Sequence, residues 1–404
     1  MIRIKIALLL LITVVIGCKQ NASSTETEKN KTWFKGNLHT HSYWSDGDEF
    51  PEVILDWYKK RNYQFMALSD HNTISEGDKW ITIREDSLYQ NAFQDYLDTY
   101  GSNWVESKTD SGRTLVKLKT FQEYRNKIEE KGKFLIIHSE EITDDFEGNP
   151  IHMNATNIQK LIEPQGGNSV VEVMQNNLDA VRKQREETGI PTILHLNHPN
   201  YYFGVSTDDI IALNGERFFE VYNGHPAVRN TGDSTHLSTE KMWDLINIAY
   251  VENKKPLLYG LATDDSHEYH TKGSKWSNAG RGWVMVQADT LSAAALILSL
   301  EAGDFYSSTG VVLKKVAHFK NTLSIEVAQE AGVSYEIKFI GCKKGELETE
   351  ELLSVTGTKA DFKLTDDVIF VRCKIISSKL QDNPIENILY EMAWTQPILG
   401  IDTP

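Results

Sequence analysis

The stretch GNLHTHSYWSDG, residues 36–47, places two histidines and an aspartate directly after a short run of strand-like sequence. In an extended segment, residues two apart point to the same side, so His39 and His41 can face one cation. Asp46 follows in a turn-rich segment and can reach back toward a second ion. The stretch therefore predicts a strand whose carboxyl end carries metal-binding side chains.

The same arrangement recurs along the chain to about residue 308. Short apolar runs alternate with longer helical stretches, which predicts parallel strands with helices on both faces. The apolar runs are 65–70, 134–141, 192–199, 218–224 and 257–265, and the helical stretches include 49–62, 170–189, 238–255 and 289–303. Chain length leaves a choice between a barrel and an open doubly wound sheet. No G-x-G-x-x-G follows an early strand, so a dinucleotide-binding fold has no support.

Histidines and carboxylates gather at the ends of these apolar runs. The residues concerned are His39, His41, His71, His138, Glu140, Glu141, His152, His195, His198, Asp264, Asp265 and His267. In a parallel α/β barrel the carboxyl ends of the strands converge on one rim, where the chemistry takes place. Imidazole and carboxylate are the usual ligands of divalent transition metals. One H-x-H pair could be a coincidence, but its repetition after successive runs predicts a metal centre.

Two regions depart from this alternation. After residue 312 the apolar period changes to two, in 322–328, 334–340 and 368–376, which predicts a small antiparallel β domain. Segment 75–125 is rich in aromatic and charged residues and has no clear strand. It is expected to be an insertion, either a lid over the site or a helical excursion on the surface.

The first residues predict export and a lipid anchor. Arg3 and Lys5 precede an apolar run that ends at Cys18 and is too short for a comfortable transmembrane helix of about 20 residues. The residues before Cys18 resemble a bacterial lipobox, in which the cysteine thiol takes up diacylglycerol. The alternative is an ordinary secretory signal or an uncleaved anchor with an incidental cysteine. We expect a signal peptide at 1–18, a polar tether at 19–31 and a protein anchored in the bacterial envelope, periplasmic or surface-exposed.

Composition narrows the choice of partners. The formal net charge of −15 disfavours nucleic acid, because binding phosphate backbones requires clustered lysines and arginines. Besides Cys18, the chain contains Cys342 and Cys373. Alternation places Cys373 on an apolar strand face and Cys342 on a mostly polar one, so we expect two separate thiols rather than a disulfide.

The order of these motifs resembles that of the PHP family, named for its polymerase and histidinol phosphatase members. The resemblance covers roughly residues 33–310 and depends on LHTHSYWSDG, ALSDHNT, SEEIT with IHMNA, LNHP and ATDDSH. It implies a distorted (β/α)7 TIM-like barrel at 32–312, followed by a β-sandwich-like domain at 313–404. Hydrolytic members of the family hold two or three divalent ions at the carboxyl rim of the barrel.

Carried over residue by residue, the resemblance implies three sets of ligands. They are His39, His41, Glu141 and Asp265 for the first ion, Glu141 with His152 and His198 for the second, and Asp46, His71 and His267 for the third. Glu141 is chosen over Glu140 because it precedes IT, where the bridging glutamate of the family stands. The D-x-H spacing to His267 selects Asp265 over Asp264.

The remaining polar residues have weaker assignments. Asp70 is expected to orient an imidazole without binding metal directly. His138 is expected to lie in the core or to contact a metal ligand, and His195 is expected to be buried. His225 and His270 could line the pocket. His236 and His318 have no assigned role.

Such a centre is suited to hydrolysis. Divalent ions lower the pKa of bound water, so that hydroxide forms near neutral pH and can attack a phosphoester. A rim histidine or Arg281 could then assist the leaving group, although Arg281 could equally form a structural ion pair. No G-x-S-x-G motif supplies a competing nucleophile.

The sequence therefore predicts a metal-dependent phosphoesterase that uses Mn, Fe, Zn or Mg. Its expected substrate is a small-molecule or carbohydrate-linked phosphoester, and its contact with the membrane is through lipid alone. The first alternative is hydrolysis of an amide, lactone or carbohydrate ester at the same centre. The second is a non-catalytic envelope protein that binds its partner through the β domain.

Overall fold

The computed structural model describes residues 31–401, which belong to one compact unit. The predicted signal peptide, Cys18 and all but the last residue of the tether lie outside the described residues. Among residues 31–401, no helix combines the length and the apolar character needed to cross a membrane.

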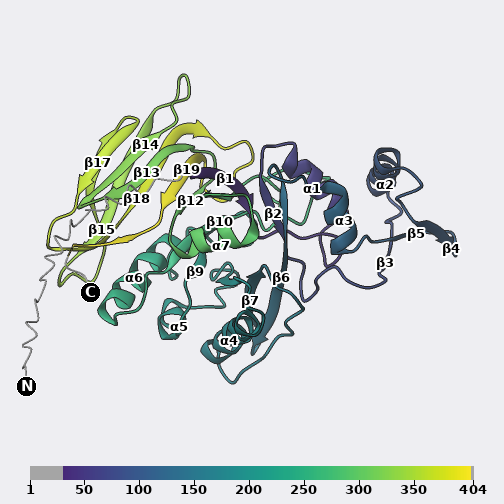
Figure 1. The fold of residues 1–404 in the computed structure, drawn as a ribbon, viewed down its shortest axis with the longest axis horizontal. Helices are drawn as coiled ribbons and strands as arrows, with labels where there is room; N and C mark the ends of the chain where they lie inside the picture. Colours follow the sequence, from purple (N-terminus) through teal and green to yellow (C-terminus); the bar gives the residue numbers. More distant parts are fainter. Residues whose placement is uncertain (1–30, 402–404) are drawn as a thin grey trace, which may run out of the picture. The chain divides into compact units, whose positions relative to one another are not determined.

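Fourteen strands form one large mixed sheet (Figure 1). Thirteen follow in the order β10-β9-β8-β7-β6-β2-β1-β11-β12-β19-β18-β15-β16, and β20 pairs with β18. Their bounds are β1 Thr32–Asn37, β2 Phe65–Leu68, β6 Leu135–Phe146, β7 Asn149–Thr156, β8 Ile193–Leu196, β9 Phe218–Asn223, β10 Tyr259–Thr263, β11 Trp283–Ala288, β12 Phe305–Ser308, β15 Tyr335–Lys343, β16 Glu350–Thr356, β18 Val368–Leu380, β19 Tyr390–Thr395 and β20 Ile398–Leu399. The predicted apolar runs thus all contain strands of one sheet.

The strand directions are only partly as predicted. Parallel pairs join β1 to β2, β2 to β6, β8 to β9, and β9 to β10. By contrast, β7 runs antiparallel to both β6 and β8, and β11 runs antiparallel to β1. The expectation of parallel strands is wrong at these places. At β7 the reason is that β6 and β7 are joined through Glu147 and Gly148 alone. Both residues have positive φ, 53° and 82°, as a tight hairpin turn requires, and two residues leave no room for a crossover helix.

The segments that follow β1 and β10 lie side by side. Thr40 forms a parallel bridge with Ser266. The N–H of His41 donates to the carbonyl of Ser266, and the N–H of Asp265 donates to the carbonyl of His39, both at 3.0 Å. The two ends of the parallel part of the sheet therefore meet at the carboxyl ends of their strands.

Seven helices accompany the described strands. They are α1 Pro51–Lys59, α2 Ser87–Tyr100, α3 Phe121–Ile128, α4 Val170–Thr188, α5 Thr207–Ala212, α6 Thr239–Glu252 and α7 Ala293–Glu301. The four predicted helices are confirmed as α1, α4, α6 and α7. For α4, the Ser169 hydroxyl accepts the N–H of Glu172, and Gly189 ends the helix with a left-handed φ of 68°. In Figure 1, α4, α5 and α6 follow one another along the part of the sheet that contains β6 to β10.

Segment 75–125 contains a small antiparallel sheet, so the expectation that it has no strand is wrong. Its strands are β3 Trp80–Thr82, β4 Ser107–Asp110 and β5 Arg113–Lys117, in the order β3-β5-β4. All four residues of β4 are exposed, which explains why the segment shows no apolar alternation. The turn between β4 and β5 uses Ser111 and Gly112, both with positive φ.

The same segment supports the loop that carries Asp46. The Trp44 indole donates to the carbonyl of Lys119 at 3.0 Å, and the Tyr89 hydroxyl donates to Asp48 at 3.0 Å. No residue of 75–125 lines the cavity over the predicted metal ligands. The structure therefore gives this segment a supporting position next to the site.

Beyond residue 312 the described strands pair antiparallel, as predicted. β13 Leu313–Phe319, β14 Thr322–Val327 and β17 Lys359–Lys363 form a second sheet, whose apolar side chains share one core with those of β15, β18 and β19. The large sheet continues across the predicted boundary, because β12 pairs with β19. The boundary at 312/313 stays a prediction.

Cys342 and Cys373 are both free thiols, which confirms that they form no disulfide. Cys373 belongs to the core between the two sheets. Cys342 lies on the opposite face of β15, as expected, but it is fully buried there against Ile248 of α6 and Phe370. The expectation of a polar setting for Cys342 is wrong because α6 covers that face.

Candidate metal centre

Glu141, a fully buried residue of β6, lies at the centre of the predicted ligands. Five imidazoles approach its carboxylate within 3.5 Å. The contacts to Oε2 are His39 Nε2 at 3.0 Å, His41 Nε2 at 3.0 Å and His71 Nδ1 at 3.3 Å, and those to Oε1 are His152 Nδ1 at 3.0 Å and His198 Nε2 at 3.5 Å. These residues come from β7 and from the segments after β1, β2 and β8. Sheet topology thus brings distant parts of the chain to one buried carboxylate.

Asp265 supplies a second carboxylate beside the first pair of histidines. Its Oδ1 lies 3.2 Å from Nε2 of His39 and 3.2 Å from Nε2 of His41. Its backbone has a left-handed φ of 49°. The side chains of Asp265 and the neighbouring Asp264 therefore point in different directions. Asp264 instead accepts hydrogen bonds from the N–H groups of residues 280–282 and from the Tyr58 hydroxyl. Asp265, and not Asp264, faces the cluster.

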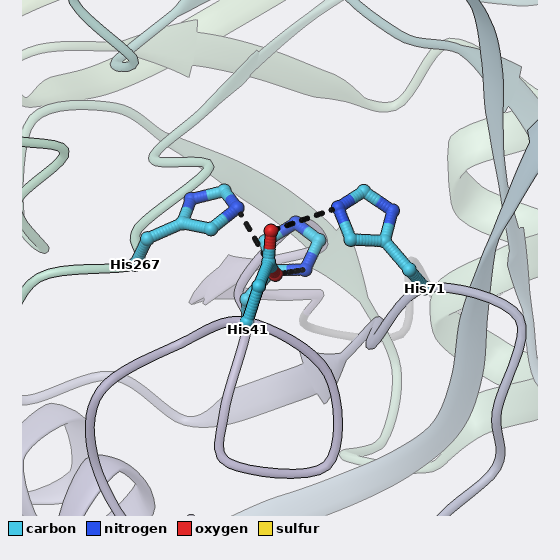
Figure 2. Close-up of side chains that lie close together, drawn as sticks. His41, His71 and His267 are labelled. Carbon is cyan, nitrogen blue, oxygen red and sulfur yellow. Dashed lines mark ion pairs between the residues drawn. The ribbon is translucent and has the colours of Figure 1, made fainter. Parts of the chain in front are cut away.

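Asp46, His71 and His267 form a third group next to His41. The Asp46 carboxylate lies 3.4 Å from Nε2 of His267, 3.5 Å from Nε2 of His71 and 3.6 Å from Nδ1 of His41. Figure 2 shows the imidazoles of His41, His71 and His267 converging from different segments. Asp46 is the most exposed member of the group, so this end of the cluster faces the opening of the cavity.

The first predicted ligand set has the spacing expected around one ion. Two ligand atoms bound at about 2.1 Å lie roughly 3.0–3.4 Å apart when they subtend an angle of about 90° to 109° at the metal. Nε2 of His41 lies 3.0 Å from Glu141 and 3.2 Å from Asp265, yet it forms a hydrogen bond with neither. All nine predicted ligands belong to groups of His, Asp and Glu whose ligand atoms lie within 4.8 Å of one another. The residues therefore fit a centre of several divalent ions.

The pKa values show how strongly these groups act on one another. Burial by itself lowers the pKa of His41, but the contacts with the Asp265 and Glu141 carboxylates outweigh it and raise the pKa to about 10. Burial raises the pKa of Glu141, but the surrounding imidazoles hold it well below its usual value. For His267, burial and the nearby His41 charge lower the pKa to about 3. Protons alone thus compensate the buried carboxylates unevenly, whereas divalent cations can compensate several of them together.

Glu220 of β9 was not predicted, although it is part of this arrangement. Its Oε1 lies 2.7 Å from Nδ1 of His39 and accepts the Thr263 hydroxyl at 2.7 Å. Its Oε2 accepts the N–H of His198 at 2.9 Å and the Asn223 amide at 2.7 Å. A carboxylate on the far nitrogen of a ligand histidine fixes the ring and leaves the other nitrogen free for metal. The available signal was a single glutamate inside the apolar run 218–224.

Asp70 and Arg281 have structural tasks that differ from those expected. The Asp70 carboxylate accepts hydrogen bonds of 2.7–3.0 Å from the N–H and hydroxyl groups of Ser42 and Ser45. It thus fixes the loop between His41 and Asp46 and does not orient an imidazole. The buried Arg281 guanidinium donates to the carbonyls of residues 224, 273, 276 and 383. Four of its five N–H groups are used in this way and it does not line the cavity, so its candidacy as an aid to the leaving group is wrong.

The other histidines differ in whether they are buried, line the cavity or are exposed. His195 is fully buried, as expected, and His138 is half-buried against Phe121, with its ring nitrogens close to two backbone carbonyls. His225 lines the cavity, whereas His270 lies 2.9 Å from the carbonyl of Asp48 and does not line it. His236 and His318 are exposed.

A cavity of about 250 Å³ opens over the cluster. Its walls are Asp46, His71, Glu141, His152, His198, Tyr201, His225, Asp265, His267 and Glu268. Seven of these ten are predicted metal ligands, so the predicted centre and the cavity coincide.

Glu140 provides an internal comparison for Glu141. Its Oε1 accepts the N–H of Ile162 at 2.8 Å, and its Oε2 is buried with no hydrogen-bond partner among residues 31–401. Burial raises the pKa of Glu140 to about 8. Glu140 is therefore mainly protonated at neutral pH and takes no part in the cluster.

This raised pKa predicts a pH dependence of stability. Because the folded protein holds the Glu140 proton more tightly than the unfolded chain, the free energy of unfolding should fall as pH rises from about 4.5 toward 8. Glu140→Gln should remove this contribution, so the variant should gain on the order of 4 kcal/mol relative to wild type between about pH 5 and pH 9. Urea unfolding of both proteins at the two pH values measures it. A difference that does not change with pH would contradict the assignment.

Comparison with known proteins assigns no family to this chain. No protein-family model matches the chain, and no curated protein matches it. Similar solved structures include a two-domain protein from Bacteroides vulgatus containing a predicted PHP-like metal-dependent phosphoesterase, with 13% identity, a TM-score of 0.41, and coverage of 91% of this chain and 96% of that one. Another, from Bifidobacterium adolescentis, is provisionally described as a metal-dependent phosphoesterase, with 12% identity, a TM-score of 0.29, and coverage of 60% and 87%. Likeness at these values does not determine chemistry, which has to follow from the side chains of this chain.

The fold and the cluster define the class of the protein. It is a mixed α/β protein with a large sheet and with clusters of histidine, aspartate and glutamate that could hold metal ions.

Proposed function

We propose that this protein is a metal-dependent phosphoesterase. The observation that carries the proposal is the buried Glu141 carboxylate, with five imidazole nitrogens within 3.5 Å. Groups of this kind, gathered out of water, are stabilised when cations lie between them. The order of the motifs along the chain, which resembles that of the PHP family, supports the same proposal.

In this proposal two or three divalent ions, drawn from Mn, Fe, Zn and Mg, occupy the three ligand sets given above. The donor set of imidazoles and carboxylates suits each of these metals. Glu141 would help to hold both the first and the second ion. Asp46 would help to hold the third from the loop that Asp70 fixes.

The chain prepares this centre through contacts around the ligands. Glu220 fixes the ring of His39, and Asn223 donates to both Glu220 and Asp265 at 2.7 and 3.1 Å. Ligands held in place before the ions bind lose little freedom on binding. When bound, such ions lower the pKa of water and neutralise the charge that develops on phosphoryl oxygens.

We further propose that the substrate is a small-molecule or carbohydrate-linked phosphoester. A cavity of about 250 Å³ is suited to a phosphoryl group and a small portion of its alcohol. The net charge of −15 disfavours nucleic acid as a partner.

The proposed architecture and cellular location are those that the sequence predicts. Residues 32–312 would form the distorted (β/α)7 barrel, with the bridge between Thr40 and Ser266 closing the ring, and residues 313–404 the appended β domain. Lipid on Cys18 would hold the protein in the bacterial envelope, periplasmic or surface-exposed.

One observation favours a second candidate, the hydrolysis of an amide, lactone or carbohydrate ester. None of the described residues that line the cavity is a lysine or an arginine. A phosphoryl group would therefore depend on the metal ions alone for positive charge, whereas a neutral ester would need none beyond them.

The test uses the full chain with Mn²⁺ and nitrophenyl phosphate, beside a panel of alkyl phosphates, carboxylic esters, lactones and amides. Turnover of phosphoesters that is lost in His39→Ala and on chelation supports the proposal, and the exposed His236→Ala serves as the control. Metal binding with turnover of only esters, lactones or amides favours the second candidate. Metal binding without any turnover would favour a non-catalytic envelope protein.

A further inference from the structure

The cavity offers few groups that could donate a hydrogen bond to a substrate. Apart from the predicted metal ligands, its walls consist of Tyr201, His225 and Glu268. Arg281 is close in the chain to the site but donates only to backbone carbonyls. The donors left for a leaving group are therefore the Tyr201 hydroxyl and the ring of His225.

The ring of His225 is held so that one nitrogen is free. Its Nδ1 accepts the N–H of Ala227 at 3.1 Å, so Nδ1 carries no proton in the neutral ring and the proton is on Nε2. No residue within 31–401 forms a hydrogen bond with Nε2. The ring lies edge-on to His267, at 5.5 Å between centroids, and to Tyr201, at 6.0 Å.

The backbone of His225 is fixed by the same residues that order the cluster. Its N–H donates to Oδ1 of Asn223 at 2.8 Å, and Asn223 also contacts Asp265. At Gly224 a Cβ would lie 2.7 Å from the carbonyl oxygen of Asp264, so the chain can pass this close to β10 only with glycine there. A donor on a segment tied to Asp265 keeps its position relative to the predicted ions.

We propose that the Nε2–H of His225 donates a hydrogen bond to the leaving-group oxygen of the substrate. This rests on the proposed phosphoesterase function. As the bond from phosphorus to the leaving oxygen breaks and a bond to the oxygen of water forms, the electron pair of the broken bond stays on the leaving oxygen, and the attacking water loses its proton to solvent. His225 keeps its proton and stabilises that charge through the hydrogen bond, and solvent water then protonates the departing alkoxide.

The test compares His225→Ala with His225→Gln, whose amide can donate from nearly the place of Nε2. The substrates are nitrophenyl phosphate, phenyl phosphate, whose leaving group has a pKa of about 10 as in tyrosine, and an alkyl phosphate. His225→Ala should lower kcat about a hundredfold on the alkyl phosphate, with a much smaller loss on nitrophenyl phosphate, because a poor leaving group needs the donor most. His225→Gln should recover part of the loss, and the metal content of both variants should equal that of wild type.

Each contrary result has a separate meaning. A loss of equal size on all three substrates, or no loss on any, would overturn the role of His225 while leaving the phosphoesterase proposal standing. If Tyr201→Phe shows the graded loss that we expect of His225→Ala, the donor is Tyr201, and the role proposed for His225 is overturned. A metal-loaded wild type inactive on all three substrates would overturn the phosphoesterase function and this role with it.

Discussion

Glu141→Gln should lower phosphoester hydrolysis by about a thousandfold or more, because loss of the shared carboxylate removes several kcal/mol of stabilisation that metal ions supply. The amide has nearly the same shape but lacks the negative charge that five imidazoles surround. We expect the variant to fold and to retain fewer divalent ions than wild type. Steady-state kinetics together with metal analysis of the same preparation measures both effects.

The matched control for this experiment is Glu140→Gln. Glu140 is the preceding residue on the same strand and is equally buried, but its carboxyl group contacts the N–H of Ile162 instead of the cluster. Its pKa of about 8 means that a neutral amide resembles its usual form at neutral pH. Wild-type activity in Glu141→Gln, or equal losses in both variants, would show that the bridging role of Glu141 is wrong.

Asp244→Ala should lower the free energy of unfolding by about 3 kcal/mol, because it leaves the buried Arg372 with only Glu240, 3.5 Å from its Nη2, as an acidic partner among the described residues. Nε of Arg372 on β18 donates to Asp244 of α6 at 2.7 Å, and Nη2 donates to the other carboxylate oxygen at 3.0 Å. The arginine side chain is only 2% exposed, and the ring of Trp243 lies 4.9 Å from its guanidinium carbon. The pair joins α6 to β18, so its loss should weaken the contact between these two elements. Urea unfolding of the full chain measures the change.

Two comparisons separate this effect from a general sensitivity to substitution. Lys160→Ala removes an exposed ion pair with Glu187 and should change stability by less than about 1 kcal/mol. Replacing both buried partners, Asp244→Leu with Arg372→Met, should recover much of the loss, because no uncompensated charge remains. If Asp244→Ala changes the free energy of unfolding no more than Lys160→Ala does, the buried pair does not stabilise the fold as predicted.

The sequence predicts much of this fold because the spacing of apolar residues and the capping of helices depend only on residues that are close together in the chain. The helix predicted at 170–189 is confirmed as α4, which the structure caps with Ser169 and Gly189. Strand direction was less predictable at β7, where the two-residue turn at Glu147 and Gly148 replaces a crossover helix. The exposed strand β4 has no apolar face to reveal it.

The candidate site was predictable to the extent that its residues follow strands. His39, His71 and His267 stand where apolar runs end, and their convergence depends on strand order alone. Glu220 could not be placed in the same way, because it lies inside β9 and its role depends on how closely β9 approaches the segment after β1. Likewise, only the packing of α6 reveals that Cys342 is buried.

The most direct test of the metal centre is elemental analysis of the full chain after purification without chelator. The wild-type protein should contain two or three divalent ions for each chain and Glu141→Gln fewer, with Glu140→Gln equal to wild type. A wild-type protein that contains no divalent metal and takes up none of Mn²⁺, Fe²⁺, Zn²⁺ or Mg²⁺ would contradict the proposed metal centre.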